Sequence, residues 1–488
     1  MNFYFSAAQV LDRLDAKQGS IKGLIATLPE KDRKRTSALV IETLKYKAPL
    51  NDVIHEAQLL KEERKKLTSA NLTLVLVHDL LLSNGGIQAG DGPIKQAVLR
   101  HKTRLKAELQ KLKIKRGVAS DAELALFGDT RASQIPRYAR VNTLICSTEI
   151  AVEYFVSQGF KLSSPFDEKS NNKGFSKDEH ISDLLLFHPQ ISFQDDAFYK
   201  AGKIILQDKA SCFPATVLNP PATKDTAVID ATAAPGNKTS HLSALMQNKG
   251  KLFAFEKDKR RFNTLEMMLS KAKCKNVKLV NADFLTTDPL DRDLSMVTHI
   301  LLDPSCSGSG IVNRLDYLLE QEQESESDQG ERLHKLASFQ LLMIKHGMKF
   351  PNVKKIVYST CSVHAIENEH VVAEALKSDE AKHGNFKLAT ASEVLPQWPR
   401  RGLPQEIDDP RLAQSLVRCM PGDDKTNGFF VSCFIRNEVS DEPVLRNDAR
   451  KSKRRLEDKS DQLAADAQTG DGPRKKKRKK KNRKTLVS

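Results

Sequence analysis

Two cysteines stand where a thiol could do chemistry. Cys306 lies in the segment LLDPSCSGSG (301–310), three residues after Asp303, in a loop of glycine and serine. Cys361 lies in VYSTCSVHAIENE (357–369), after a β-branched run that predicts a strand and before a stretch that predicts a helix. A thiol at a helix N-terminus has a lowered pKa and a larger thiolate fraction. The other five cysteines are predicted to be inert apolar residues: Cys146, Cys212, Cys274, Cys419 and Cys433.

One reaction needs a thiol of this kind. The C5 carbon of cytosine is a poor nucleophile, and addition of a thiolate to C6 turns C5 into an enamine carbon that can attack an electrophilic methyl group. An acid near N3 stabilises the intermediate, and the C5 proton must leave before the thiol is eliminated. Cys306, Cys361 and Asp303 are the groups that the sequence offers for these roles.

A turn of small residues indicates a bound cofactor. The segment DATAAPGNKTSHL (230–242) follows a predicted strand, and Ala233 to Gly236 are small or turn-forming. Small residues let the backbone approach a ligand, and the helix that follows offers free N–H groups. The segment is neither a GxGxxG loop nor a GxxxxGK[ST] loop, so NAD and ATP are disfavoured.

Acidic residues come at or just after the ends of four predicted strands in succession: Asp230, Glu256, Asp283 and Asp303. A carboxylate at Glu256 could accept from two ribose hydroxyls, and one at Asp283 from an adenine amino group. Four such acids in succession predict that they line one rim of a sheet, beside both thiols.

The elements that must position these residues alternate in type. Predicted strands are 227–230, 251–256, 277–282, 299–303, 355–359 and 428–436, and predicted helices are 238–247, 258–272, 332–349 and 365–377. This alternation predicts a mostly parallel sheet wrapped by helices, which binds ligands at the carboxyl ends of its strands. It does not distinguish a methyltransferase from a dehydrogenase.

The N-terminal residues, to about 120, have apolar residues at helical spacing. Within them, residues 95–116 form one basic amphipathic pattern, with nine Lys or Arg against one Glu and with apolar positions for one face. This pattern fits a solvated helix face or a phosphate-contacting surface equally well. The apolar positions of that face are Leu99, Leu105, Leu109 and Leu112.

A small α/β module is predicted after Pro136, with a strand at 137–145, a helix at 149–160 and another strand at 183–187. Further on, residues 320–331 are acidic and of low complexity, which predicts a surface loop.

Composition limits the classes of function. The 488 residues carry a net charge of +16, of which ten positive charges fall in 474–484 and leave about +6 for the rest. This charge indicates a polyanionic partner, most commonly nucleic acid, with an acidic protein surface as the alternative. Seven cysteines without CxxC or zinc-like spacing, and no signal or membrane-spanning run, predict free thiols in the nucleus or cytosol and no metal.

Together these segments resemble a known family. DATAAPGNKT, FEKD, NADF, DPSCSGSG, YSTCS with ENE, and TNGFFVSCFIR are similar in order and spacing to the Sun-domain RNA cytosine-C5 methyltransferases. The segments 4–25, 104–118 and 205–212 resemble the branch that methylates large-subunit ribosomal RNA, so the resemblance covers about residues 1 to 436. One departure fits that branch: the usual DAPCSG reads Asp303-Pro304-Ser305-Cys306 here.

The resemblance implies a role for each site residue. Cys361 would be the nucleophile and Cys306 would promote release of the product, with Asp303 and Lys238 helping to hold the target cytosine. The cofactor would be S-adenosylmethionine. Its binding residues would be Ala233, Ala234, Pro235, Gly236, Asn237, Lys238, Thr239, Glu256, Arg261, Asp283 and Asp303.

The resemblance also predicts the fold: an α/β protein whose Rossmann-like class I methyltransferase core follows a small RNA-recognition-like module and an N-terminal helical domain. The expected boundaries are 1–130 for the helical domain, 136–205 for the module, 206–436 for the core and 440–488 for a disordered basic tail. In the module, Arg137 and Arg140 are predicted to contact the RNA backbone.

The expected partner is large-subunit ribosomal RNA or a pre-ribosomal particle, met by a monomer with no membrane association. The basic run 474–484 predicts residence in the nucleus and nucleolus. Two alternatives stay open at this point. One is the same chemistry on another RNA, such as a transfer RNA, and the other is a ribosome-assembly factor that binds RNA with little catalysis.

Overall fold

The computed structural model describes residues 2–313, 315–319 and 326–437. The predicted basic tail (440–488) lies outside the described residues, as do residues 320–325 of the acidic segment. Among the helices that are described, none is long and apolar enough to cross a membrane.

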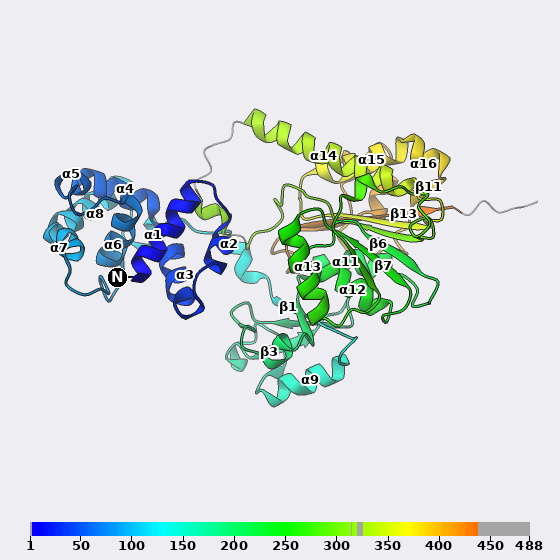
Figure 1. Cartoon of the computed structure of the whole chain (residues 1–488), viewed down its shortest axis with the longest axis horizontal. Helices are drawn as coiled ribbons and strands as arrows, with labels where there is room; N and C mark the ends of the chain where they lie inside the picture. Colours follow the sequence, from blue (N-terminus) through cyan, green and yellow to red (C-terminus); the bar gives the residue numbers. More distant parts are fainter. Residues whose placement is uncertain (1, 314, 320–325, 438–488) are drawn as a thin grey trace, which may run out of the picture. The chain divides into compact units, whose positions relative to one another are not determined.

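Helices alone form the N-terminal part, as the apolar spacing predicts (Figure 1). The first of them buries Tyr4, Ala7, Leu11 and Leu14 along one stripe, which joins a common apolar core. The helices are α1 (Asn2–Asp15), α2 (Ile21–Ala26), α3 (Glu30–Lys45), α4 (Lys47–Glu56), α5 (Leu59–Glu62), α6 (Ala70–Leu82), α7 (Pro93–Arg100) and α8 (Lys102–Arg116).

The basic pattern at 95–116 is divided between α7 and α8, which meet at His101. Leu105 and Leu109 are buried, while Leu99 and Leu112 pack against the same core half-buried. Six of the nine basic side chains form ion pairs with carboxylates: Lys95–Asp91, Arg100–Glu63, Arg104–Glu62, Lys111–Glu108, Lys113–Asp121 and Arg116–Asp52. Five of these six acids lie outside α7 and α8, so the charge of this face is far smaller than its sequence suggests.

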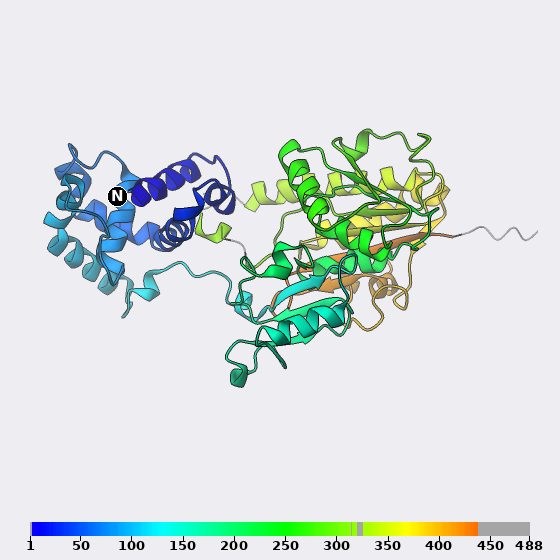
Figure 2. The same ribbon diagram turned by 60° about the horizontal axis from the view of Figure 1, so that its bottom comes forward.

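A five-stranded sheet follows, in the order β2-β3-β4-β1-β5. Helix α9 (Thr148–Ser157) lies along one face of it and buries Ala151 and Phe155 there (Figure 2). The other elements of this module are β1 (Arg137–Val141), β2 (Lys161–Leu162), β3 (Gly174–Lys177), β4 (Leu184–Phe187), α10 (Ala197–Lys200) and β5 (Ile204–Leu206).

The larger sheet has eight strands, with the path β11-β13-β10-β9-β6-β7-β8 and with β12 paired to β13. Strands β6 to β10 pair in parallel, whereas β11, β12 and β13 add antiparallel pairings at one edge. The strands are β6 (Ala227–Asp230), β7 (Lys251–Phe255), β8 (Val277–Val280), β9 (His299–Leu302), β10 (Lys355–Thr360), β11 (Phe386–Leu388), β12 (Val417–Cys419) and β13 (Phe429–Arg436).

Helices cover both faces of this sheet, because successive strand residues point to opposite sides (Figure 1). Ile229 and Ile356 lie in one apolar cluster with residues of α14 and α15, whereas Val228 and Val357 lie in another with residues of α11 and α12. The helices are α11 (Lys209–Leu218), α12 (Asn237–Leu245), α13 (Lys259–Lys271), α14 (Glu326–Met348), α15 (Glu369–Lys377) and α16 (Asp379–His383).

Two predicted elements differ from the structure. The acidic segment was expected to stay a loop as far as residue 331, but α14 already begins at Glu326, since acidic residues favour the first turn of a helix. The helix expected over 365–377 is instead the short 3₁₀ turn η6 (Ala365–Glu367) followed by α15.

Candidate active site

The two cysteines singled out by sequence face each other. Cys306 follows β9 and Cys361 follows β10, and these two strands pair in parallel. Their Sγ atoms are 3.0 Å apart, within hydrogen-bond distance of two thiols and far beyond a disulfide bond. The backbone N–H of Gly310 donates to the carbonyl of Cys361 at 2.9 Å, which ties the two loops together.

The electrostatics of the pair favour the protonated form of Cys306. The hydrogen bond to Cys361 is the largest cause that raises the pKa of Cys306, and burial adds to it. Cys306 therefore keeps its proton and can donate it toward the sulfur of Cys361. The helix that was expected to activate Cys361 is not there, because the first helical turn begins four residues later, at Ala365.

A lysine supplies positive charge beside Cys361 instead. The Nζ of Lys238 lies 2.7 Å from the Oδ2 of Asp303, and the hydroxyl of Ser359 donates to the Oδ1 of Asp303 at 2.7 Å. Burial alone would lower the pKa of Lys238, but Asp303, Asp230 and Cys361 outweigh it and raise that pKa. The ammonium ion thus persists close to the reactive sulfur, where it favours the thiolate.

Two cavities meet at this point. One, of about 510 Å³, is lined by Glu256, Asp283 and Cys306 among others, and the second, of about 680 Å³, by Lys238 and Asn427 among others. Asp303, Pro304 and Cys361 line both. The site can therefore hold one ligand on each side of Cys361.

The first cavity fits a nucleoside-like cofactor. The carboxylate of Glu256 is almost fully buried and accepts from the N–H of Asp258 at 2.9 Å, with a guanidinium nitrogen of Arg261 at 3.5 Å from it. Asp283 accepts from the N–H of Leu285 at 3.0 Å. Apolar contacts come from Phe284, Phe339 and Met343. Carboxylates for hydroxyls or amino groups, beside an apolar wall, suit an adenosine-sized ligand.

The predicted cofactor residues do not all reach that cavity. Glu256, Arg261, Asp283 and Asp303 line it, whereas Asn237 and Lys238 line the second cavity. Ala233, Ala234, Pro235, Gly236 and Thr239 line neither of the two.

The turn 233–239 has a packing role. Ala233 and Ala234 join a small apolar cluster with Leu265 and Leu269 of α13. Gly236 has φ +112°, and a Cβ there would lie 3.2 Å from Leu265, so only glycine fits. The hydroxyl of Thr239 donates to Asp230, which is buried and whose pKa burial raises to about 6. The turn therefore anchors the start of α12, which carries Lys238.

Sequence reasoning missed several residues of the second cavity. Asp208 accepts from the amide nitrogen of Asn427 at 2.8 Å and from the hydroxyl of Thr426, across more than 200 residues of chain. Phe429 adds an aromatic ring 5.3 Å from the Nζ of Lys238. The sequence did carry a signal for these residues, because they lie in ILQDKASC and TNGFFVSC, two segments on which the family resemblance rests.

The two arginines of the module differ in exposure. Arg137 lies on the surface, donates to the carbonyl of Pro189 at 3.0 Å and lines the second cavity. Arg140 was expected to contact RNA, but this prediction is wrong because its side chain is fully buried. It donates to Gln207 at 2.9 Å and to Ser240 at 2.8 Å, and so stabilises the first turn of α12.

None of the other five cysteines lines either cavity. Four of them are buried and Cys274 is half-buried. Burial raises the pKa of each, in Cys433 to about 12, which disfavours the reactive thiolate.

Three family models match successive parts of the chain. Residues 215–435 match a model described as 16S rRNA methyltransferase RsmB/F. Residues 34–125 and 135–207 match the N-terminal and the ferredoxin-like domain of NOL1/NOP2/Sun domain family member 5.

Individual relatives span nearly the whole chain. The 25S rRNA (cytosine-C(5))-methyltransferase rcm1 of Schizosaccharomyces pombe is 45% identical over 432 residues, covering 88% of this chain and 91% of that protein. A 28S rRNA (cytosine-C(5))-methyltransferase of Mus musculus is 42% identical over 456 residues, covering 92% and 94%. Among solved structures, that of PH0851 aligns with a TM-score of 0.58 at 19% identity, over 88% of this chain and 97% of that one, a likeness of fold.

Proposed function

The chain belongs to the Sun-domain family of ribosomal RNA cytosine-C5 methyltransferases, and from this membership we propose that it methylates C5 of a cytosine in large-subunit ribosomal RNA. The predicted α/β fold with a class I methyltransferase core is confirmed by the same matches. The observation that carries the proposal is the pair of thiols 3.0 Å apart where two cavities meet.

Cys361 is the nucleophile of the proposed reaction. Its thiolate adds to C6 of a cytosine that enters the second cavity, and the electrons of the C5–C6 double bond move toward N3. Lys238 and Asp303 hold a proton between atoms 2.7 Å apart at the edge of that cavity. The ammonium of Lys238 passes this proton by way of Asp303 to N3, which offsets the negative charge that develops there and leaves Lys238 as a neutral amine.

When bound, S-adenosylmethionine supplies the electrophilic methyl group to which C5 becomes bonded. Glu256 is suited to its ribose hydroxyls and Asp283 to its adenine amino group, and both line the first cavity. Phe284 and Met343 exclude water from the apolar wall of that cavity.

Cys306 removes the C5 proton. Before the reaction its pKa is raised chiefly by the hydrogen bond to Cys361. Once the sulfur of Cys361 is bonded to C6, that cause is gone, so Cys306 releases its proton to solvent more readily and becomes a base. It then takes the proton from C5, the C5–C6 double bond re-forms, the bond from C6 to Cys361 breaks, and N3 returns its proton to the pair of Asp303 and Lys238. This order explains why a second thiol is adjacent to the nucleophile.

The proposal also includes the cellular setting. The relatives named above are ribosomal RNA methyltransferases, and ribosomal RNA is made in the nucleolus, so we place the protein in the nucleus and nucleolus, acting as a monomer on ribosomal RNA or a pre-ribosomal particle. The division into a helical domain, a small module, a core and a tail at the boundaries predicted from sequence is part of the same proposal.

Bisulfite mapping of large-subunit ribosomal RNA tests this function. Cells that lack the protein should lose 5-methylcytosine at one position, and the natural chain should restore it where a Cys361→Ala variant does not. An unchanged ribosomal RNA pattern, with a mark lost from transfer RNA instead, would overturn the choice of substrate. No lost mark in any RNA would overturn the activity.

A further inference from the structure

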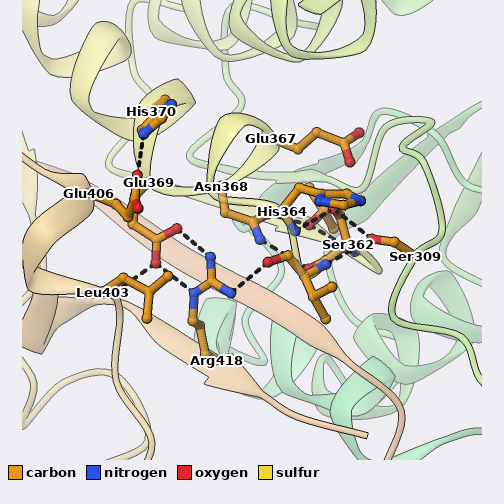
Figure 3. A network of polar contacts seen from close by, with 12 residues as sticks. Ser309, Ser362, His364, Glu367, Asn368, Glu369, His370, Leu403, Glu406 and Arg418 are labelled. Atoms are coloured by element: carbon orange, nitrogen blue, oxygen red, sulfur yellow. Dashed lines mark hydrogen bonds and ion pairs between the residues drawn. The ribbon is translucent and has the colours of Figure 1, made fainter. Parts of the chain in front are cut away.

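The triplet Glu367-Asn368-Glu369 runs from the last residue of η6 to the first residue of α15. All three side chains are fully buried, and none of the three lines either cavity of the site. Their role must therefore come from the groups that they hold; Figure 3 shows Asn368 beside Ser362, and Glu369 paired with Arg418.

Glu367 holds the Cys306 loop. Its Oε1 accepts from the N–H of Ser307 at 2.9 Å, and its Oε2 from the hydroxyl of Ser307 at 2.5 Å. Gln340, buried on α14, donates both to Oε1 of Glu367 at 3.0 Å and to the carbonyl of Ser305 at 3.1 Å. The residues on either side of Cys306 are thus fixed by one buried pair, Glu367 and Gln340.

Asn368 holds the Cys361 loop in a similar way. Its Oδ1 accepts from the hydroxyl of Thr360 at 2.6 Å, and its Nδ2 donates to the carbonyl of Ser362 at 3.0 Å. Thr360 and Ser362 are the two neighbours of Cys361.

Glu369 holds Val363, the residue after Ser362, through Arg418. Its carboxylate pairs with Arg418 at 2.6 Å and 2.7 Å, and Arg418 donates to the carbonyl of Val363 at 3.0 Å (Figure 3). The hydroxyls of Ser309 and Ser362, 3.2 Å apart, then join the two loops to each other. The triplet and its partners thus hold residues next to both thiols, in addition to the pairing of β9 with β10.

We propose that Glu367 and Asn368 are positioning residues with separate tasks: Glu367 places Cys306 for product release, and Asn368 places Cys361 for attack. This assignment rests on the proposed function. It predicts that two adjacent buried side chains, each altered by one atom, block different steps of one reaction. A misplacement of about 1 Å at a reacting group can cost roughly a hundredfold in rate.

Two isosteric variants of the full-length protein test the assignment, with large-subunit ribosomal RNA from cells lacking the protein as substrate. Glu367→Gln should lower turnover roughly tenfold to a hundredfold and leave a covalent protein–RNA adduct that survives denaturation. In a Cys306→Ala background, which traps the adduct, Glu367→Gln should leave the rate of adduct formation within about twofold, whereas Asn368→Asp should lower it roughly tenfold or more. Glu374→Gln, exposed on α15, is the control and should change neither quantity.

Ser307→Ala provides a second variant should Glu367→Gln fail to fold, because it removes a hydroxyl that Glu367 holds and leaves the buried carboxylate in place. It should also accumulate adduct. The assignment is overturned if the Glu367 and Ser307 variants turn over normally, or if they slow adduct formation as much as Asn368→Asp does. If Cys306→Ala alone forms no adduct, the proposed function itself fails, and the assignment fails with it.

Discussion

Ion pairs between a basic side chain and a carboxylate occur both at the edge of the large sheet and on the basic helices α7 and α8, but they differ in exposure to water. At the sheet edge, Lys238 pairs with Asp303 beside a reactive thiol, and their side chains are 14% and 26% exposed. On α8, Arg104 pairs with Glu62, and their side chains are 42% and 45% exposed. The first pair is partly desolvated and acts on a neighbouring sulfur, whereas the second is screened by water.

This difference teaches that the number of charges along a segment says little about what they do. Residues 95–116 carry nine basic side chains, but six are paired, five of them with acids outside α7 and α8. At the sheet edge, Lys238 lies beside Cys361, and its burial makes its charge effective. The following predictions test whether burial, rather than charge count, separates the two regions.

The largest effect is expected at Lys238. Lys238→Met keeps the length of the side chain but removes the ammonium that favours the Cys361 thiolate and offsets charge on the ring. The methylation rate should fall roughly 10²- to 10³-fold, measured by transfer of labelled methyl groups to ribosomal RNA. Lys335→Met, on the exposed face of α14, is the matched control and should stay near the parent rate. A loss smaller than about threefold at Lys238 would remove this residue from the mechanism.

Substitution of a buried and of an exposed arginine compares the effect of burial on the free energy of unfolding. Arg140→Leu breaks hydrogen bonds from a fully buried guanidinium to Gln207 and Ser240, and should lower the free energy of unfolding in urea by about 2–4 kcal/mol. Arg104→Leu breaks one exposed ion pair and should cost less than about 1 kcal/mol. Equal losses in the two variants would contradict the comparison.

The reactivity of Cys306 reports on its neighbour. Its raised pKa means that little thiolate forms at pH 8, so alkylation by iodoacetamide should be slow in the parent protein. In Cys361→Ala the largest cause of that shift is removed while burial remains. Alkylation of Cys306 at pH 8 should therefore become several-fold faster, as followed by mass spectrometry of its peptide. A rate that does not rise would show that the thiols do not interact.

The smallest effect is expected on α8. Lys102, Lys106 and Lys115 are exposed, and among the described residues no acidic group pairs with them at ion-pair distance. Changing all three to Gln should reduce the slope of log affinity against log salt for RNA by no more than about 0.7, one phosphate contact. A reduction near 2 would instead identify this face as a phosphate-contacting surface.

Much of the site could be predicted because its signal is local. Each of Glu256, Asp283 and Asp303 follows a short apolar strand, and parallel strands bring their carboxyl ends to one edge, where these acids line a cavity. Cys306 and Cys361 met for the same reason, since their strands are neighbours.

The rest depends on contacts between distant segments. Asp208 meets Thr426 and Asn427 across 218 and 219 residues, and Arg140 meets Ser240 across 100. An arginine in a strand pattern gives no sign of whether it faces water or the interior, so Arg140 was misassigned. Likewise, the charge that assists Cys361 comes from Lys238 on another element and not from the local helix that the sequence suggested.

The most direct test of the central claim is the covalent adduct formed with ribosomal RNA. Cys306→Ala, incubated with the RNA and S-adenosylmethionine and then denatured, should show a protein–RNA species whose cross-linked peptide contains Cys361. The double variant Cys306→Ala, Cys361→Ala should show none. An adduct of equal yield in the double variant, or one that maps to another residue, would contradict Cys361 as the nucleophile.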